Sequence, residues 1–331
     1  MKKNRELKLL ITFITICLII TSCTNVENKE DLALDPNFNF DDCPKAWSIE
    51  ELKTGLDMFC QVALLGGDQK LTEFPDILGE MPYLRSIDAC RNRITHIPKF
   101  LSKLEQLDLS NNMLDKCPSG LKNLRDLIML ELSNNSIKRI DKAIFKMSNL
   151  EVLWFSDNLL DKIPTRLCSL TNIRILAFSG NNLTTIPPEI GELFNLEELY
   201  IGDQEIVSLP NELGQLKKLK NLNIGSNYSG GGISNTFESI PTCIFELEAL
   251  EYLDLSYGNI SEIPPDIARL SNLEILVLSG NELTNLPEEI KNLKKLKYLY
   301  LGDNYLSEEE EKIRSWFSKD VYVEFEVEVG D

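Results

Sequence analysis

One stretch decides the fold: LEILVLSGNELTNLPEEIKNLKK, residues 273–295. Leucines stand at its positions 1, 4, 6 and 11, an asparagine at position 9, and a Leu-Pro pair at positions 14 and 15. The same pattern begins again at Leu84, Leu104, Leu127, Leu150, Ile173, Leu196, Leu219, Leu250 and Leu296. Most steps are 23 residues; the first is 20, and the step from Leu219 is 31, so eight residues are inserted there. A fixed period predicts a stack of similar units.

Each position of the unit has a physical role. Positions 4 and 6 of a short strand point inward, while positions 3, 5 and 7 point outward. One strand cannot bury its apolar side alone, so neighbouring units bury it for one another. The asparagines at position 9 are expected to satisfy turning backbone inside the stack; they are Asn92, Asn112, Asn135, Asn158, Asn181, Asn227, Asn281 and Asn304. Gln204 and Gly258 replace asparagine, so we expect the ladder of asparagine contacts to be broken or water-filled there, with local irregularity.

This pattern resembles the leucine-rich repeat proteins, in particular the type with 23 residues, asparagine at position 9 and proline at position 15. The resemblance covers residues 84–306, and a degenerate unit near Gln61 extends it. It implies an α/β solenoid: a curved horseshoe with a parallel concave β-sheet, short helical or irregular convex segments, and a cap at each end.

The first residues have the features of an export signal. A basic start is followed by the apolar run LLITFITICLII, which is shorter than a comfortable membrane span. It ends in ITSC, which resembles the lipobox of bacterial lipoproteins, so residues 1–22 are expected to be cleaved and Cys23 to carry lipid. The alternative is an uncleaved anchor helix. The first interpretation places the protein outside the cytoplasm, lipid-anchored to the cell envelope at the outer membrane or cell surface.

Residues 23–42 are acidic and lack periodicity, which predicts a flexible tether. Without residues 1–22 the chain has 30 basic and 51 acidic side chains, a net charge of −21. This balance argues against nucleic acid as a partner. It also argues against broad contact with anionic lipid, so we expect contact with the membrane only through the N-terminal lipid. We also expect a monomer.

Residues 43–83 are predicted to form the N-terminal cap and the degenerate first repeat. Cys43 and Cys60 flank a predicted amphipathic helix, and export allows a disulfide between them. Two free thiols are the alternative. Cys117 stands in an aliphatic slot and is expected in the core.

Two segments depart from the repeat. The insertion at residues 228–237, YSGGGISNTF, follows a strand and is either a functional loop or a tolerated insertion. Residues 307–331 are predicted to be the C-terminal cap. Ser307 and Glu310 have capping-box spacing ahead of a helix whose Trp316 and Phe317 close the stack, and VYVEFEVEVG alternates like a last strand.

The sequence offers no catalytic set. His96 is the one histidine and is expected at the surface without a partner. There is no phosphate loop, nucleophile elbow or zinc motif. We therefore expect neither an enzyme nor a cofactor nor a metal site.

The outward strand positions contain more aromatic and aliphatic residues than a solvated sheet requires. Trp and Tyr concentrate binding energy at interfaces. The candidate partner-binding residues are Met129, Val152, Trp154, Ile175, Ala177, Tyr200, Tyr252, Val277, Tyr298 and Tyr300. We expect Ala177 to leave a shallow gap between Trp154 and Tyr200. A protein bound to the concave face is the first hypothesis; a carbohydrate-binding or adhesive surface protein is the second, and a structural spacer without a ligand is the third.

Overall fold

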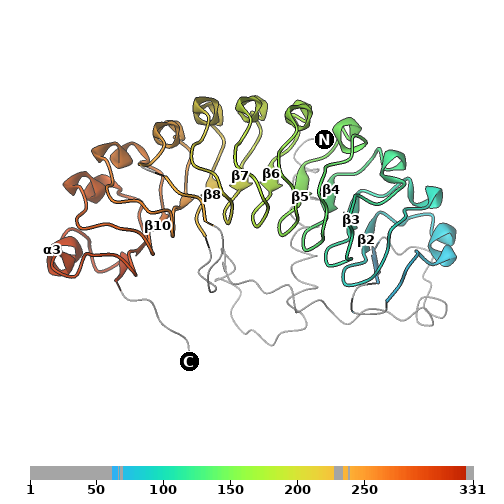
Figure 1. Cartoon of the computed structure of the whole chain (residues 1–331), viewed down its shortest axis with the longest axis horizontal. Helices are drawn as coiled ribbons and strands as arrows, with labels where there is room; N and C mark the ends of the chain where they lie inside the picture. The colour runs from blue at the N-terminus through green and yellow to red at the C-terminus, as the bar shows by residue number, and fades with distance from the viewer. Residues whose placement is uncertain (1–61, 66, 68–69, 227–233, 238, 326–331) are drawn as a thin grey trace.

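The computed structural model describes residues 62–65, 67, 70–226, 234–237 and 239–325. Within them twelve strands form one sheet, and their order in the sheet is their order in the chain. The strands line the inner side of an arc (Figure 1). They are β1 Val62–Leu64, β2 Ser86–Asp88, β3 Gln106–Asp108, β4 Met129–Glu131, β5 Val152–Trp154, β6 Ile175–Ala177, β7 Glu198–Tyr200, β8 Asn221–Asn223, β9 Tyr252–Asp254, β10 Ile275–Val277, β11 Tyr298–Tyr300 and β12 Tyr322–Glu324.

All neighbouring strands are parallel and pair in the phase of the repeat. Leu153 of β5, for example, lies opposite Leu130 of β4 and Leu176 of β6. These central residues are fully buried, as are those two positions later, where the rings of Phe155 and Phe178 stack at 5.9 Å. The predicted horseshoe with a parallel sheet is confirmed.

The return segments are short 3-10 helices on the outer, convex side of the arc (Figure 1). From η6 onward each begins directly after the proline of position 15, because proline fixes φ and needs no hydrogen-bond acceptor there. The helices are η2 Asp76–Glu80, η3 Lys99–Leu101, η4 Leu121–Asn123, η5 Ile144–Lys146, η6 Thr165–Ser169, η7 Pro188–Glu192, η8 Asn211–Gln215, η9 Thr242–Glu246, η10 Pro265–Arg269 and η11 Glu288–Asn292.

The asparagines of position 9 form a ladder inside the stack. The Asn158 side chain accepts a hydrogen bond from the N–H of Ile137 at 2.9 Å and donates to the carbonyls of Leu132 and Phe155 at 2.9 and 3.1 Å. Each such side chain therefore joins two adjacent units through backbone groups that water cannot reach.

The expectation of a broken ladder at Gln204 was wrong. Its longer side chain accepts from the N–H of Leu183 at 2.9 Å and donates to the carbonyl of Phe178 at 2.5 Å. Gly258 has no side chain to continue the ladder. Its carbonyl instead accepts a hydrogen bond from the N–H of Phe237 at 3.0 Å, the kind of bond that the asparagine side chain accepts in other units. A backbone group replaces the absent amide there.

The asparagine predicted at 227 lies outside the described residues, and Asn235 holds the ladder place of this unit. The Asn235 amide donates to the carbonyls of Ile201 and Ile224, each at 2.9 Å. Phe237 is buried in the core. Asn235 and Phe237 therefore belong to the repeat, and the insertion ends before them rather than at 237.

Position 8 has a backbone requirement that the sequence analysis missed. In nine units this residue has a φ of 52° to 69°, the left-handed region. Asn, Asp and Gly tolerate that conformation, and they hold seven of these places. The residues are Arg91, Asn111, Asn134, Asp157, Gly180, Asp203, Tyr257, Gly280 and Asp303.

The C-terminal end is closed by α3 Glu310–Ser315 and by β12, which pairs with β11. The capping box predicted at Ser307 is not formed, because α3 begins at Glu310 after Glu309 and has no side-chain cap. Ile313 is fully buried, whereas Trp316 and Phe317 are half-buried against the core.

Several sequence predictions fall outside the described residues: the signal segment, Cys23, the tether, and Cys43 with Cys60. Four described cysteines are buried: Cys90, Cys117, Cys168 and Cys243. In the described part of the chain, no helix is long and apolar enough to cross a bilayer.

Candidate functional site

The sheet face turned toward the inside of the arc carries positions 3 and 5 of every unit. The 3-10 helices lie on the opposite, convex side, and α3 lies at the C-terminal end of the arc (Figure 1). Among the described residues, therefore, no helical layer covers this face. Because the strands stay in register, each position forms a continuous row across the sheet. The rows present different chemistry along the arc.

The middle of the face is apolar and aromatic. Trp154, Ala177 and Tyr200 lie in register on β5, β6 and β7, so the two aromatic residues are two strand spacings apart, roughly 10 Å between backbones. Met129, Val152 and Ile175 form the adjacent row. Val152, predicted as a contact residue, is only 8% exposed, so Met129 and Ile175 supply the accessible area of this row. The predicted residues of this region are thus brought together by the fold.

The shallow gap predicted at Ala177 is absent, because Ala177 is only 7% exposed. Trp154 and Tyr200, on the strands to either side, are half-buried. On an inward-curving sheet, side chains of one row lean together, so a small residue between two large ones is covered. The accessible surface is therefore that of Trp154 and Tyr200 themselves.

Tyr200 is held in place by its neighbours. Its hydroxyl donates a hydrogen bond to Glu198 Oε2 at 2.7 Å. Burial is the larger cause, and the adjacent Glu198 carboxylate the smaller one, of the raised pKa of Tyr200. A fixed aromatic ring loses little rotamer freedom when a partner covers it.

Beyond Tyr200 the face becomes polar around Asp254. Asn223 Nδ2 and the Tyr252 hydroxyl both donate to Asp254 Oδ2, at 3.0 and 3.3 Å. Tyr252, predicted as a contact residue, is 9% exposed and can offer a partner little area. Its hydroxyl takes part in the hydrogen-bond network around Asp254 instead.

The last strands present a tyrosine cluster. The rings of Tyr298, Tyr300 and Tyr322 lie 6.1 to 6.4 Å apart, with Tyr298 and Tyr300 stacked. Tyr298 is 43% and Tyr322 54% exposed. Half-buried Val277 lies on the preceding strand, in register with Tyr300. Tyr322 was not among the predicted contact residues, because the phase of the repeat ends before β12.

The first units present carboxylates at position 5. Asp88, Asp108 and Glu131 each accept a hydrogen bond from the backbone N–H two residues later, at 3.0, 2.8 and 2.5 Å. Burial raises the pKa of Glu131 to about 7. Burial, with Asp88 and Glu131 nearby, also holds the pKa of Asp108 well above its usual range. Among the described residues no group of His, Cys, Asp and Glu has the geometry of a metal site.

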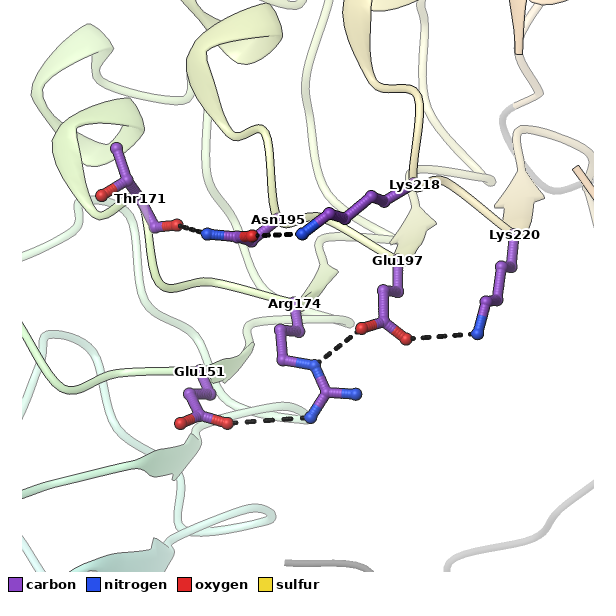
Figure 2. Close-up of polar contacts among 7 residues, drawn as sticks. All are labelled: Glu151, Thr171, Arg174, Asn195, Glu197, Lys218 and Lys220. Carbon is purple, nitrogen blue, oxygen red and sulfur yellow. Dashed lines mark hydrogen bonds and ion pairs between the residues drawn. The ribbon is translucent and has the colours of Figure 1, made fainter. Parts of the chain in front are cut away.

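A ladder of charges runs along the rim where the strands begin, shown in Figure 2. Arg174 lies between Glu151 at 3.8 Å and Glu197 at 2.9 Å, and Lys220 is 3.6 Å from the other oxygen of Glu197. Burial opposes ionisation of Glu197, but the two cations outweigh it and lower its pKa.

A parallel set of amide contacts follows the same rim. Lys218 Nζ donates to Asn195 Oδ1, and the Asn195 amide donates to the Thr171 carbonyl, each at 2.8 Å (Figure 2). None of these rim residues was among the predicted site residues, although the alternating charge of Glu151, Arg174, Glu197 and Lys220 at the period of the repeat is visible in the sequence. Together the ion pairs and the amide contacts join the segments that lead into β5 to β8, the strands on either side of and including those of Trp154 and Tyr200.

His96 is exposed, as predicted, but it has a partner. Its Nδ1 lies 2.8 Å from Ser119 Oγ. The contact joins two return segments and is not linked to the sheet face.

Comparisons with known proteins agree with this architecture. Two family models match, both described as leucine-rich repeat: one at residues 125–183 and 248–306, the other at 103–124. No curated protein matches the chain.

Three solved structures illustrate the likeness. A leucine-rich repeat protein of Leptospira interrogans is 29% identical, with a TM-score of 0.52 and coverage of 76% of this chain and 74% of that one. The ectodomain of the Arabidopsis thaliana receptor kinase GASSHO1/SCHENGEN3, solved in complex with CASPARIAN STRIP INTEGRITY FACTOR 2, is also 29% identical, with a TM-score of 0.59 and coverage of 74% of this chain. The match spans only 30% of that receptor chain. An internalin (inlF) from Listeria monocytogenes, 22% identical over 84% of this chain and 89% of that one, shares the fold with a TM-score of 0.55.

Proposed function

Because the chain is a leucine-rich repeat protein, we propose that it is a non-enzymatic interaction module that binds a protein partner through the concave face of its sheet. Leucine-rich repeat domains are protein-interaction modules, and receptors are among the similar structures. The choice of face and the identity of the site are our inference.

One observation carries the proposal: the row of Trp154 and Tyr200 beside half-buried Met129 and Ile175. These residues lie on a sheet face that no helix of the described chain covers (Figure 1). Large aromatic residues at the centre of an open face are the usual anchors of protein interfaces. The ion-pair rim and the Glu198 hydrogen bond hold them in a preformed arrangement.

The proposal includes attachment to the bacterial envelope through lipid on Cys23. Its support is the basic and apolar start of the chain and the ITSC stretch. Attachment through two or more acyl chains would be stable. Metabolic labelling with a fatty-acid probe should mark the wild type and not Cys23→Ser; equal labelling of both would refute the attachment.

Site-specific photocrosslinking tests the binding face. A benzophenone amino acid placed at Tyr200 should trap a protein in native envelopes. The matched position is Phe194, which is exposed on the return segment after η7 and should trap no comparable product. A crosslinked product from Phe194 and none from Tyr200 would place the interface on the convex side and refute binding through the concave face.

A carbohydrate is the second candidate partner. The observation that favours it is the exposed cluster of Tyr298, Tyr300 and Tyr322, since aromatic rings beside carboxylates also suit sugars. A glycan array probed with the purified protein separates the two functions. Specific glycan signals that Tyr298→Ala abolishes would favour the carbohydrate.

A further inference from the structure

The charge of this protein is unevenly distributed along the arc. Residues 84–170 contain fourteen Lys or Arg against ten Asp or Glu, whereas residues 171–331 contain twelve against twenty-eight. The net charge of the whole chain, −18, therefore conceals a basic segment in the first units. Within that segment the concave face is acidic, so the excess of basic residues lies off that face, part of it on the return segments.

A groove between η4 and η5 gathers part of this charge. It has a volume of about 650 Å³ and is lined by Lys122, Arg125, Lys142 and Lys146. Its one carboxylate is Asp141, whose Oδ1 accepts a hydrogen bond from the N–H of Ala143 at 2.7 Å. All four cations are exposed.

These four cations have no ion-pair or hydrogen-bond partner for their side chains among the described residues. The other half of the arc is different: every Lys and Arg from Arg174 onward except Lys319 has such a partner. The groove between η9 and η10 offers a direct contrast. Its Arg269 is neutralised by Glu246 at 2.6 Å and Asp266 at 3.7 Å.

Local sequence explains why space exists between η4 and η5. Asp141 stands where η6 to η11 have proline, and η5 begins only at Ile144. In the preceding unit Gly120 adopts a φ of 101°, and a Cβ there would lie 2.1 Å from the Ile97 carbonyl oxygen, so η4 begins only at Leu121. Both helices have three residues instead of five. The groove therefore results from the short return segments at η4 and η5.

We propose that this groove binds phosphoryl groups at an anionic membrane surface and turns the convex side of the first units toward the bilayer. Clustered Lys and Arg are attracted to anionic lipid, with the attraction limited to about a Debye length. The acidic second half of the arc would be repelled by the same surface, which orients the molecule. The concave face would remain open, so this proposal is independent of the protein partner proposed above.

A membrane surface explains one more feature than a soluble anion does. On the neighbouring η3, Phe100 is exposed between Lys99 and Lys103. An aromatic or apolar side chain flanked by lysines is typical of segments that lie at the lipid interface. The expectation of membrane contact through lipid alone rests on the net charge of the whole chain, whereas this proposal rests on the local charge of the first units.

Vesicle binding tests the proposal. The full chain is mixed with phosphatidylcholine vesicles, with or without one third phosphatidylglycerol, and the readout is the ratio of the two affinities. This ratio cancels any binding common to both vesicles. The wild type should prefer the anionic vesicles by roughly tenfold or more at low salt, and the preference should fall as salt is added.

Two variants of equal charge change localise the effect. The combination Lys122→Glu, Lys142→Glu and Lys146→Glu should bring the ratio close to one. The combination Lys291→Glu, Lys294→Glu and Lys295→Glu, on and after η11, should keep most of it. Circular dichroism confirms that both fold.

Three results would overturn the proposal. The wild type could show no preference for anionic vesicles. Both triple variants could lose the preference equally, which would make it an effect of net charge. Inorganic phosphate at constant ionic strength could abolish the preference, which would assign the groove to a soluble anion instead of a membrane.

Discussion

Replacing Asn181 by alanine tests whether the amide ladder holds the units together. The side chain is 3% exposed. Its Oδ1 accepts from the N–H of Leu160 at 2.9 Å, and its Nδ2 donates to the carbonyls of Phe155 and Phe178 at 2.9 and 2.7 Å. These backbone groups belong to two different units, so the substitution affects the joint between them.

The hydrogen bonds that remain in Asn181→Ala determine how much folding stability is lost. The Phe155 carbonyl keeps a bond from Asn158, and the Phe178 carbonyl keeps one from Gln204. Leu160 N–H alone is left without its acceptor. One buried donor without an acceptor costs roughly 1 to 3 kcal/mol, and each of the two lost bonds to the Phe155 and Phe178 carbonyls costs about 0.5 to 1.5 kcal/mol, so the loss of stability sums to about 2 to 6 kcal/mol.

Urea unfolding followed by circular dichroism measures this cost. The matched control is Asn172→Ala, which removes an exposed amide that donates to the Ser148 carbonyl at 2.7 Å and should cost less than about 1 kcal/mol. Amide hydrogen exchange at Leu160 should also accelerate in Asn181→Ala. Equal costs for the two substitutions, or unchanged exchange at Leu160, would refute the ladder as the source of stability.

Two further predictions follow from the carboxylates and the cap. The raised pKa of Glu131, about 7, means that the folded state holds its proton more tightly than the unfolded chain does, so stability should fall as pH rises from about 4.5 through 7. Glu131→Gln should flatten this dependence by up to roughly 3 kcal/mol in chemical unfolding, and an unchanged profile would contradict the assignment. Trp316 is only half-buried, so Trp316→Ala should cost about 2 kcal/mol, less than truncating a fully buried aromatic; an unchanged unfolding midpoint would show that the C-terminal segment does not close the stack.

The period of the sequence predicts the fold closely because every unit repeats the same burial. Leu153, Leu176 and their equivalents are buried in register wherever the phase places them. What the period cannot show is how one residue substitutes for another in the same place. Gln204 continues the ladder through a longer side chain, and Asn235 takes the place expected of Asn227, because hydrogen-bond geometry and not residue identity decides the position.

The sequence predicted which face of the sheet the candidate residues lie on, but not how exposed each side chain is. Phase places Trp154, Ala177 and Tyr200 on one outward row, and the structure confirms that register. The exposed area depends on curvature, which covers Ala177 and Tyr252 with their neighbours. Tyr322 and the groove between η4 and η5 lie where the repeat ends or shortens, and there the period carries no information.

The most direct test of the central claim is the affinity of the captured partner for Trp154→Ala. Trp154 lies on the open sheet face, so its truncation should weaken binding at least about tenfold while changing the unfolding midpoint little. Truncating an anchor on this face should raise the dissociation rate, which surface plasmon resonance measures directly. Normal affinity of Trp154→Ala, combined with weakened affinity of the charge-reversed convex triple variant, would contradict binding through the concave face.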